Sequence, residues 1–390
     1  MSRRPRRRVL PRVGAACVAV VLAGCTAAGD GAPTSSVSAP TSGTTGTAVP
    51  GPATPDPATP VEVTDVTEVA SGLDVPWGMG LLPDGRLVVT QRDAGTLVLV
   101  GPDGQVTEVT GTGAEELRDL THAQGEGGLL GVAVGPTGED LFLYATTGQD
   151  NRVVRAALDG TVLGPLDGVL DGIPAARNHD GGRLAFGPDG FLYVTTGDAG
   201  QRQDAPDPGS LAGKILRVTT GGDPAPGNPD PGSPVWSSGH RNVEGLGWAP
   251  DGRMFASEFG QDAWDELNVI VPGGDYGWPT HEGDPGTDDG TVAPVVTWAT
   301  REASPSGLAV TDEAVYVAAL RGERLWRVPL TAGGVGEPQA LLVGEHGRLR
   351  AVEVAPDGTL WVLTGNTDGR GEIRAGDDRL LRVTLAPVVG

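Results

Sequence analysis

The feature that most constrains this chain is a short pattern that recurs six times: an apolar strand, a turn of the Pro-Asp-Gly type, and a second strand of alternating residues. Proline presets φ at such a turn, aspartate caps it and glycine supplies a positive φ, so each copy is predicted to form a β-hairpin. The copy with Thr311, Asp312 and Glu313 at its turn lacks the proline and the glycine and is the weakest. The six copies are residues 81–90, 134–144, 185–195, 248–257, 308–318 and 353–364.

The spacing of these hairpins predicts a six-bladed β-propeller. Their turns begin about 45 to 62 residues apart, and the six units occupy residues 61–390. That interval fits a blade of four antiparallel strands, with insertions in the wider intervals. A jelly roll or a sandwich does not require six in-phase copies, and 63 Gly and 33 Pro among 390 residues argue against long helices or a coiled coil. We therefore expect an all-β propeller domain over residues 61–390.

The first 25 residues have the pattern of a bacterial lipoprotein signal. Arginines crowd the first twelve positions, an apolar stretch follows from Val13 to Ala23, and the sequence then reads Gly24-Cys25. Small residues before the cysteine admit a peptidase, and the thiol would carry the lipid. Residues 1–24 are thus predicted to be a signal peptide, and lipidated Cys25 to anchor the exported protein to the outer face of the bacterial cell membrane. The alternative is an ordinary secretory signal or a short anchor, although about 11 apolar residues are too few to cross a bilayer.

Residues 25–60 are predicted to be a tether. They are mostly Ala, Gly, Pro, Ser and Thr, with no aromatic residue, and such a composition cannot bury a core. Cys17 would leave with the signal and Cys25 would be acylated. The mature chain would then have no thiol for a disulfide, a metal or nucleophilic catalysis.

The charge of the chain argues against a nucleic-acid partner. It has 50 acidic and 28 basic residues, and its formal net charge is −22. Because several of the arginines belong to the predicted signal peptide, the mature protein is more acidic still. A body of this charge repels phosphate backbones, so we expect no nucleic-acid binding.

The hairpin geometry predicts which residues line one mouth of the central channel. A tight turn places the start of one strand and the end of the next at the same face, and polar residues gather at these positions, where a structural strand more often carries Val or Thr. Before the first strands they are Trp77, Glu126, Asn178, His179, Arg241, Asn242, Ser304 to Ser306, Arg348 and Arg350. After the second strands they are Gln91, Arg92, Gly197, Asp198, residues 258–261, Leu320, Arg321, Gly365 and Asn366.

Four arginines from three blades belong to this predicted mouth: Arg241, Arg321, Arg348 and Arg350. In an acidic protein such a cluster suggests a bound small molecule with several carboxylates, which guanidinium groups bind in a bidentate manner. The alternative is that each arginine forms a salt bridge with a neighbouring Asp or Glu. Both interpretations remain open from the residues alone.

His179 is the candidate general base of this mouth. It lies in a segment with two following glycines, Gly181 and Gly182, that let the backbone open toward a ligand. An unperturbed imidazole has a pKa near 6.5, which suits the removal of a proton from an alcohol. A structural histidine is the alternative, and His240 and His122 are weaker candidates.

An acidic, glycine-rich stretch at residues 257–279 is a candidate calcium site. Ca²⁺ prefers carboxylate and carbonyl oxygens, which this stretch supplies, but no spacing in it matches an EF-hand. A solvated acidic loop is the alternative interpretation.

At these residues the sequence resembles the soluble quinoprotein aldose/glucose (sorbosone) dehydrogenase family. The family has a six-bladed propeller that binds pyrroloquinoline quinone (PQQ) and Ca²⁺. The matching segments run in family order and are together specific, although each alone is weak. They are residues 125–131, 178–184, 239–246, 257–279, 319–322 and 348–350.

The resemblance implies a role for each matching residue at the reacting centre. His179 corresponds to the base that takes the proton of the anomeric hydroxyl while hydride passes to the quinone. Arg241 corresponds to the arginine beside the quinone oxygens. The resemblance further implies that cofactor contacts are made by Asn242, Arg321, Arg348 and Arg350 and, in a looser alignment, by Trp298 and Thr300.

The resemblance also implies two calcium sites. Gly260 and Gln261 correspond to the pair whose backbone carbonyls hold the calcium on the quinone. Glu266, through its carboxylate, and Tyr276, through its carbonyl, correspond to a second, structural site.

Two departures from the family bear on the substrate. Glu126 stands where some members have Gln, and Asn178 where some have Asp; both would touch the sugar. Long insertions that narrow the mouth are also lacking, which suggests a range of aldoses wider than glucose. The expected partners are an aldose, an external electron acceptor and, through the lipid alone, the membrane.

Two other functions compete with the dehydrogenase. A metal-dependent lactonase would need three or four inward carboxylate or amide ligands, whereas the predicted mouth is rich in arginine. A non-catalytic extracellular propeller that binds glycans or proteins would not need His179 and Arg241 together.

Overall fold

A computed structural model of the protein describes residues 57–286 and 288–388. The predicted signal peptide, Cys25 and all but the last four residues of the predicted tether lie outside these described residues. The last four contact the propeller: the carbonyl of Pro57 accepts a hydrogen bond from Arg327 (2.9 Å), and that of Pro60 accepts one from Val388 (2.9 Å).

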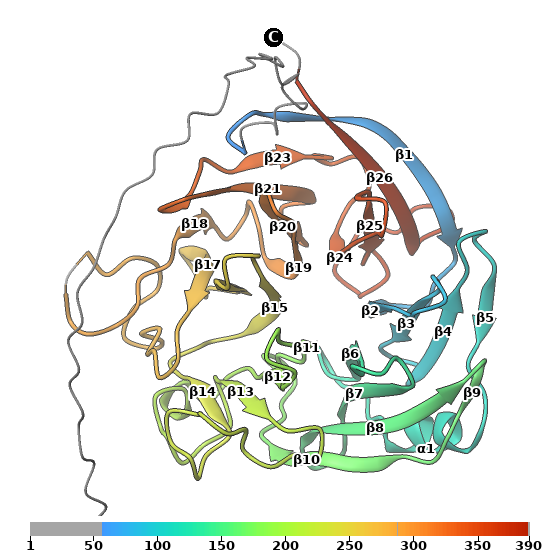
Figure 1. Cartoon of the computed structure of the whole chain (residues 1–390), viewed down its shortest axis with the longest axis horizontal. Helices are drawn as coiled ribbons and strands as arrows, with labels where there is room; N and C mark the ends of the chain where they lie inside the picture. Colours follow the sequence, from blue (N-terminus) through green and yellow to red (C-terminus); the bar gives the residue numbers. More distant parts are fainter. Residues whose placement is uncertain (1–56, 287, 389–390) are drawn as a thin grey trace, which may run out of the picture. The chain divides into compact units, whose positions relative to one another are not determined.

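The described residues form six antiparallel sheets arranged around a central channel, so the predicted all-β, six-bladed propeller is confirmed (Figure 1). Blade 1 contains β2 (Pro76–Leu81), β3 (Leu87–Gln91), β4 (Thr96–Val100) and β5 (Val106–Glu108). Blade 2 contains β6 (Leu129–Val134), β7 (Asp140–Thr146), β8 (Asn151–Asp159) and β10 (Asp167–Ile173), with the short β9 (Val162–Leu163) paired to β8. Blade 3 contains β11 (Leu184–Phe186), β12 (Leu192–Thr195), β13 (Ile215–Val218) and β14 (Val235–Ser237).

The remaining blades repeat this plan. Blade 4 contains β15 (Val243–Trp248), β16 (Met254–Glu258), β17 (Trp264–Ile270) and β18 (Val296–Ala299). Blade 5 contains β19 (Pro305–Val310), β20 (Ala314–Ala319), β21 (Arg324–Thr331) and β22 (Gly334–Val335), with β23 (Gln339–Leu341) also paired to β21. Blade 6 contains β24 (Leu349–Val354), β25 (Leu360–Thr364) and β26 (Arg379–Pro387).

Strand β1 (Val61–Ser71) completes blade 6 and closes the ring. It pairs antiparallel with β26, from Val61 opposite Pro387 to Ser71 opposite Arg379. The first folded strand and the last one therefore share a sheet, and the ring is held by hydrogen bonds between the two ends of the domain.

Each predicted hairpin joins the first two strands of a blade. The pairs β2 with β3, β6 with β7, β11 with β12, β15 with β16, β19 with β20 and β24 with β25 are all antiparallel. The first strand of each pair lies nearest the channel (Figure 1). The turn chemistry thus correctly located the inner half of all six blades.

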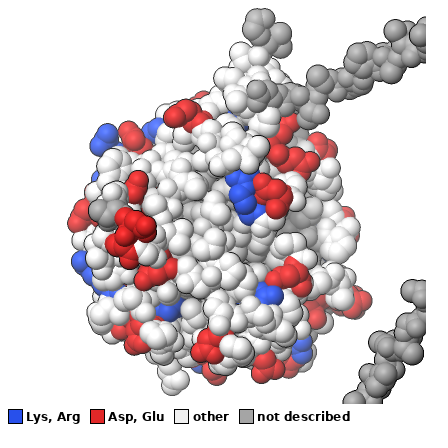
Figure 2. All heavy atoms as spheres, turned by 60° about the vertical axis from the view of Figure 1, so that its left-hand side comes forward, with Lys and Arg blue, Asp and Glu red and all other residues white. Residues whose placement is uncertain are grey.

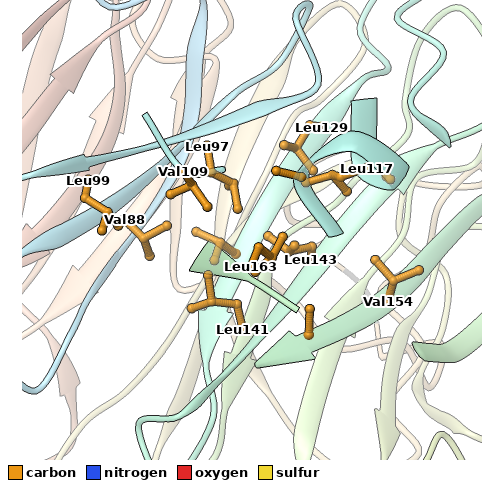
Figure 3. Packing of buried hydrophobic residues seen from close by; sticks show 14 of the residues in the cluster. Val88, Leu97, Leu99, Val109, Leu117, Leu129, Leu141, Leu143, Val154 and Leu163 are labelled. Atoms are coloured by element: carbon orange, nitrogen blue, oxygen red, sulfur yellow. The ribbon is translucent and has the colours of Figure 1, made fainter. Parts of the chain in front are cut away.

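Apolar side chains pack between neighbouring blades. Between blades 1 and 2, Val88 and Leu97 face Leu141 and Leu143 (Figure 3). The one α-helix among the described residues, α1 (Thr112–Leu120), adds Leu117 to this cluster, while a single 3-10 turn, η1 (Arg202–Asp204), precedes β13. No helix in the described part of the chain is long and apolar enough to cross a membrane.

The surface agrees with the acidic composition. On the face shown in Figure 2, acidic side chains are scattered over the molecule and basic ones are fewer. No extended basic patch is visible on that face.

Candidate active site

A cavity of about 380 Å³ is formed by residues that precede the innermost strands or follow the second strands of the blades. This is the mouth that the hairpin geometry predicts. A larger cavity of about 600 Å³ lies on the outer side of blade 2, but it holds none of the predicted site residues. The lining of the smaller cavity is Glu126, His179, Arg241, Phe259, Ser304, Leu320, Arg321, Arg348 and Arg370.

His179 lies between β10 and β11 with a left-handed backbone (φ 61°), and its imidazole is fixed by a buried carboxylate. Its Nδ1 is 2.7 Å from Oδ1 of Asp198, a residue with no exposed surface. Asp198 also accepts hydrogen bonds from the Trp278 indole N–H (2.8 Å) and the Gly200 backbone N–H (2.8 Å). Burial alone would raise the pKa of Asp198, but His179 and these donors hold it below its ordinary value. Since a carboxylate can only accept, Nδ1 of His179 carries a proton, and in the neutral imidazole Nε2 is then the nitrogen with the lone pair.

Tight packing explains the glycines around this pair. A side chain at Gly197 would place its Cβ 1.9 Å from the carbonyl oxygen of His179 and 2.7 Å from Oδ1 of Asn242. Only glycine therefore fits between the His179 loop and blade 4. The backbone of His179 and the carboxylate of Asp198 are brought together by this close approach.

Glu126 and Arg370 form an ion pair beside His179. Oε2 of Glu126 accepts the backbone N–H of His179 (2.8 Å), and Oε1 lies 2.8 Å from Nη2 of Arg370. Burial would raise the pKa of Glu126, but the His179 N–H and Arg370 hold it below its ordinary value. Sequence reasoning missed Arg370 because it lies in the loop between β25 and β26, away from any strand end. Asn178 is partly buried next to His179 but does not line the cavity.

Arg241 faces the cavity from the residue before Asn242 and β15. Its Nη1 donates to the carbonyls of Phe259 (3.2 Å) and Gly260 (2.7 Å), whereas its Nε is buried without a partner. Burial lowers the pKa of Arg241 against the opposing effect of the carboxylates around it. Asn242 is fully buried beneath the cavity, where its Oδ1 accepts the Gly181 N–H (3.0 Å) and its Nδ2 donates to Glu244 (3.2 Å).

The three remaining arginines of the predicted mouth differ in how they are paired. Arg321 lines the cavity, is exposed, and has no ion-pair partner within the described residues. Arg348 also lines the cavity, with Nη2 2.8 Å from Asp368.

Arg350 lies behind the cavity. It is only 5% exposed and makes ion pairs with Glu244 (2.9 Å) and Asp368 (3.3 Å). Arg350 thus has the contacts expected from the alternative interpretation, in which each arginine forms a salt bridge with a neighbouring Asp or Glu. Arg348 combines a salt bridge with a place on the cavity wall.

The structure does not bring Trp298 and Thr300 to the cavity. Trp298 lies on β18, the outermost strand of blade 4, where it is buried against Trp326 with ring centroids 5.6 Å apart. Thr300 follows that strand and is partly buried, and its hydroxyl lies 3.4 Å from the carbonyl of Asp262. An outer strand is separated from the channel by the three strands inside it, which is why these two residues stand apart from the others.

The candidate calcium residues lie in and beside the loop after β16. The Gly260 carbonyl is directed at Arg241, and Gln261 is partly exposed. Glu266 is buried on β17, and burial together with the charge of Glu258 raises its pKa to about 8. Tyr276 is buried, with its ring stacked on the imidazole of His240 (4.6 Å between centroids).

His240, a weaker candidate base, does not reach the cavity. It has no exposed surface, and its ring nitrogens are bonded to Ser237 and Glu258 (2.8 Å each). It follows β14 in the sequence and links Ser237 of that strand to Glu258 of β16.

The comparisons with known proteins show which family the chain is similar to. Residues 73–382 match the family described as Glucose / Sorbosone dehydrogenase. The structure of the PQQ-bound form of an aldose sugar dehydrogenase from Streptomyces coelicolor is 48% identical, with a TM-score of 0.80 over 85% of this chain and 100% of that one. Aldose sugar dehydrogenase YliI of Escherichia coli is 29% identical over 76% of this chain and 89% of its own length. Quinoprotein glucose dehydrogenase B of Acinetobacter calcoaceticus is 28% identical over 56% of this chain and 53% of its own length.

The propeller fold together with the family match defines an enzyme of the sugar dehydrogenase class. The chain belongs to the glucose/sorbosone dehydrogenase family, as the sequence resemblance predicted.

The donor groups of the cavity fit a ligand with several carboxylates. Arg321 is unpaired within the described residues, Arg348 has a face on the cavity, and Arg241 has a buried Nε without a partner. Each can donate to a carboxylate or a carbonyl oxygen of a bound molecule.

A cation is compatible with the buried acidic residues nearby. Glu258 and Glu266 are both buried, and a single Asn268 Nδ2 approaches an oxygen of each (3.4 Å and 3.0 Å). Two such carboxylates repel each other, which a cation would relieve. No group of three or more His, Cys, Asp or Glu side chains arranged for a metal occurs in the part of the chain that the structure describes. A calcium site built on these carboxylates would need further oxygen ligands, such as backbone carbonyls.

Proposed function

We propose that this enzyme is a PQQ-dependent aldose dehydrogenase that oxidises the C1 hydroxyl of an aldose to the lactone. The observation that carries the proposal is the hydrogen bond between His179 and Asp198 (2.7 Å) on a cavity that Arg241 also lines. It provides a base beside a cationic group, as an alcohol oxidation requires, in which the hydroxyl loses its proton and the adjacent carbon loses a hydride. PQQ, when bound, supplies the acceptor for the two electrons of the hydride.

His179 takes the proton of the anomeric hydroxyl on Nε2. The imidazole then carries a positive charge, and the Asp198 carboxylate at Nδ1 stabilises it. The Gly200 N–H, at the same oxygen Oδ1, and the Trp278 indole, at Oδ2, hold that carboxylate in place. The pair therefore orients the base before substrate arrives, and little reorganisation is needed during the reaction.

The arginines would hold and polarise the cofactor. Arg241, with its unpartnered Nε, is suited to stabilise negative charge on an oxygen at the reacting end. Arg321 and Arg348 are suited to bind carboxylates at the other end. Arg350 shares Asp368 with Arg348, and Asn242 donates to Glu244, the other partner of Arg350. Glu126 and Asn178 are the candidate contacts of the sugar, and Glu126 is oriented by Arg370.

We also propose that calcium takes part. The carbonyls of Gly260 and Gln261 would hold the ion that contacts the cofactor, and Glu266 with the Tyr276 carbonyl would hold a second, structural ion. Hard oxygen ligands of this kind suit Ca²⁺.

The sequence supports an extracytoplasmic location for the reaction. The signal pattern and Cys25 favour export and lipid anchoring at the outer face of the cell membrane, and electrons would then pass to an external acceptor.

A dye-linked oxidation assay tests this function. The purified protein is offered a panel of aldoses with and without PQQ and Ca²⁺, beside His179→Ala and the control His122→Ala, whose side chain is exposed and outside the cavity. We expect activity that requires both additions, survives in the control and is lost in His179→Ala. A wild-type protein that neither oxidises any aldose nor binds PQQ would refute the proposal and favour a non-catalytic binding propeller.

A further inference from the structure

The segment between β16 and β17 forms one wall of the cavity, and its carbonyl groups are directed at Arg241. Phe259 lines the cavity, and Nη1 of Arg241 donates hydrogen bonds to the carbonyl oxygens of Phe259 (3.2 Å) and Gly260 (2.7 Å). The segment has no regular secondary structure. Its shape must therefore come from contacts other than those within a helix or sheet.

Two carboxylates accept five successive N–H groups, those of Gly260 to Trp264, where Trp264 is the first residue of β17. Oδ1 of Asp265 accepts the Gly260 N–H at 2.9 Å. A single oxygen of Glu282, Oε1, accepts the next four N–H groups, those of residues 261 to 264, at 2.8, 2.9, 2.8 and 3.0 Å. Successive backbone N–H groups directed at one point form an anion-binding nest, and here a side chain of the same protein fills it.

Binding of these N–H groups fixes the direction of the carbonyls. In a trans peptide unit the N–H and C=O groups lie in one plane and point in opposite directions. When the Gln261 N–H points at Glu282, the Gly260 carbonyl must point away from Glu282, and this is the side on which Arg241 lies. In the preceding peptide unit the Gly260 N–H points at Asp265, so the Phe259 carbonyl points away from Asp265.

The nest tolerates only glycine at its start. A Cβ on Gly260 would lie 1.7 Å from the carbonyl oxygen of Trp264 and 2.7 Å from Oε1 of Glu282. The carboxylate, the glycine and the turn of the segment are therefore one packed unit.

We propose that Glu282 is a positioning residue of the active site: its carboxylate holds residues 259–264 so that the Phe259 and Gly260 carbonyls face the cavity and orient Arg241. Its effect on the reaction rests on the proposed function, whereas its effect on the loop does not. Glu282 does not line the cavity, so it is not placed to contact a substrate there. It lies in the loop that follows Trp278, and the neighbouring Gly283 N–H is bonded to Glu266 (2.7 Å).

Amide hydrogen exchange, measured by mass spectrometry on the purified protein without added cofactor, tests the loop part of the proposal. In Glu282→Ala the four N–H groups lose their acceptor and are open to water, so we expect exchange in residues 261–264 to be at least tenfold faster. Glu282→Gln keeps one neutral accepting oxygen, and hydrogen bonds to an ionised acceptor are about twice as strong as those to a neutral one. We therefore expect its exchange rate to lie between those of the wild type and Glu282→Ala. The control is Asp288→Asn. Asp288 is an exposed residue of the same loop, and its substitution removes the same charge, so we expect exchange in residues 261–264 to be unaltered.

Activity and the Ca²⁺ requirement test the catalytic part. We expect Glu282→Ala to lower kcat at least tenfold and to raise the Ca²⁺ concentration needed for half-maximal activity, with Glu282→Gln intermediate and Asp288→Asn unchanged. Unchanged exchange in Glu282→Gln and Glu282→Ala would overturn the nest. Faster exchange with unaltered kcat and Ca²⁺ requirement would overturn the positioning role. If the wild type itself oxidises no aldose, the proposed function fails, while the exchange result still decides whether Glu282 holds the loop.

Discussion

The substitution Asp198→Asn isolates the hydrogen bond that orients the proposed base. Both carboxylate oxygens accept hydrogen bonds: Oδ1 from His179 and the Gly200 N–H, and Oδ2 from the Trp278 indole. An asparagine offers one accepting oxygen and one donating nitrogen. If the nitrogen faces His179, Nδ1 must become an acceptor and Nε2 then carries the proton, so the base is lost. If it faces Trp278, two donors meet and that contact is lost.

The expected loss of activity follows from the strength of one hydrogen bond. Hydrogen bonds to charged groups contribute about 1.5–3 kcal/mol. At about 1.36 kcal/mol for each tenfold change in rate, kcat/KM should fall by roughly 10- to 150-fold. Loss of the productive tautomer would take the fall toward the upper end or beyond it.

The assay is steady-state oxidation of the best aldose by the PQQ- and Ca²⁺-loaded enzyme, with Asp230→Asn on the exposed surface as the matched control. Thermal unfolding of both variants establishes that the fold is intact. An Asp198→Asn enzyme with wild-type kcat/KM would refute the claim that Asp198 orients His179.

Two predictions concern buried charges outside the catalytic pair. Burial raises the pKa of Asp180 to about 6. The folded protein therefore keeps a proton on this carboxyl that the unfolded chain releases near pH 4. The contribution of Asp180 to the unfolding free energy is fully present below about pH 4 and is lost as the pH rises through about 6. Asp180→Asn should therefore raise the unfolding free energy by up to about 3 kcal/mol above pH 6 and by much less near pH 4. Urea unfolding at both pH values measures this difference. A change in unfolding free energy that does not vary with pH would contradict the prediction. Lys214 is fully buried, and its ammonium group donates to the carbonyls of Asp204 (2.8 Å), Ala205 (2.6 Å) and Ala212 (2.7 Å). Lys214→Met should leave these carbonyls unsatisfied and lower the unfolding free energy by roughly 3 kcal/mol or more, and a change below about 1 kcal/mol would show that the contacts matter little.

The fold was readable from the sequence because its main signal is local. Each hairpin carries its turn chemistry within about ten residues, and six repeats leave few alternatives to a propeller. The pairing of β1 with β26 has no such signal, because it joins residues at opposite ends of the domain, such as Val61 and Pro387. The register between β1 and β26 is set only when the six blades have closed into a ring.

The candidate site was predictable in its residue types and its location, but not in its pairings. His179, Arg241, Arg321 and Arg348 occupy the mouth because their positions relative to the hairpins place them there. The ion-pair partners of Arg348 and Arg350 are acidic residues in a chain that has 50 of them, and nothing local distinguishes one from another. Arg350, for example, meets Glu244 across 106 residues of sequence.

Asp198 and Glu282 illustrate the same limit. Asp198 was placed at the mouth by its position after β12, but its contact with His179 depends on how two loops approach each other. Glu282 binds N–H groups 18 to 21 residues before it, and no pattern of side chains marks those N–H groups as a nest. Trp298 shows the reverse: a loose alignment suggested a cofactor contact, whereas its strand is the outermost of blade 4.

The most direct test of the central claim is a single-turnover experiment on the PQQ- and Ca²⁺-loaded protein without an electron acceptor and without oxygen. An aldose is added, and the absorption spectrum of the bound quinone is followed for the wild type and His179→Ala. We predict that the wild type converts the spectrum to that of the reduced cofactor within one turnover, while His179→Ala binds the quinone equally well and leaves it oxidised. A wild-type protein that binds the quinone but leaves it oxidised with every aldose, or a His179→Ala protein that reduces it at the wild-type rate, would contradict the account.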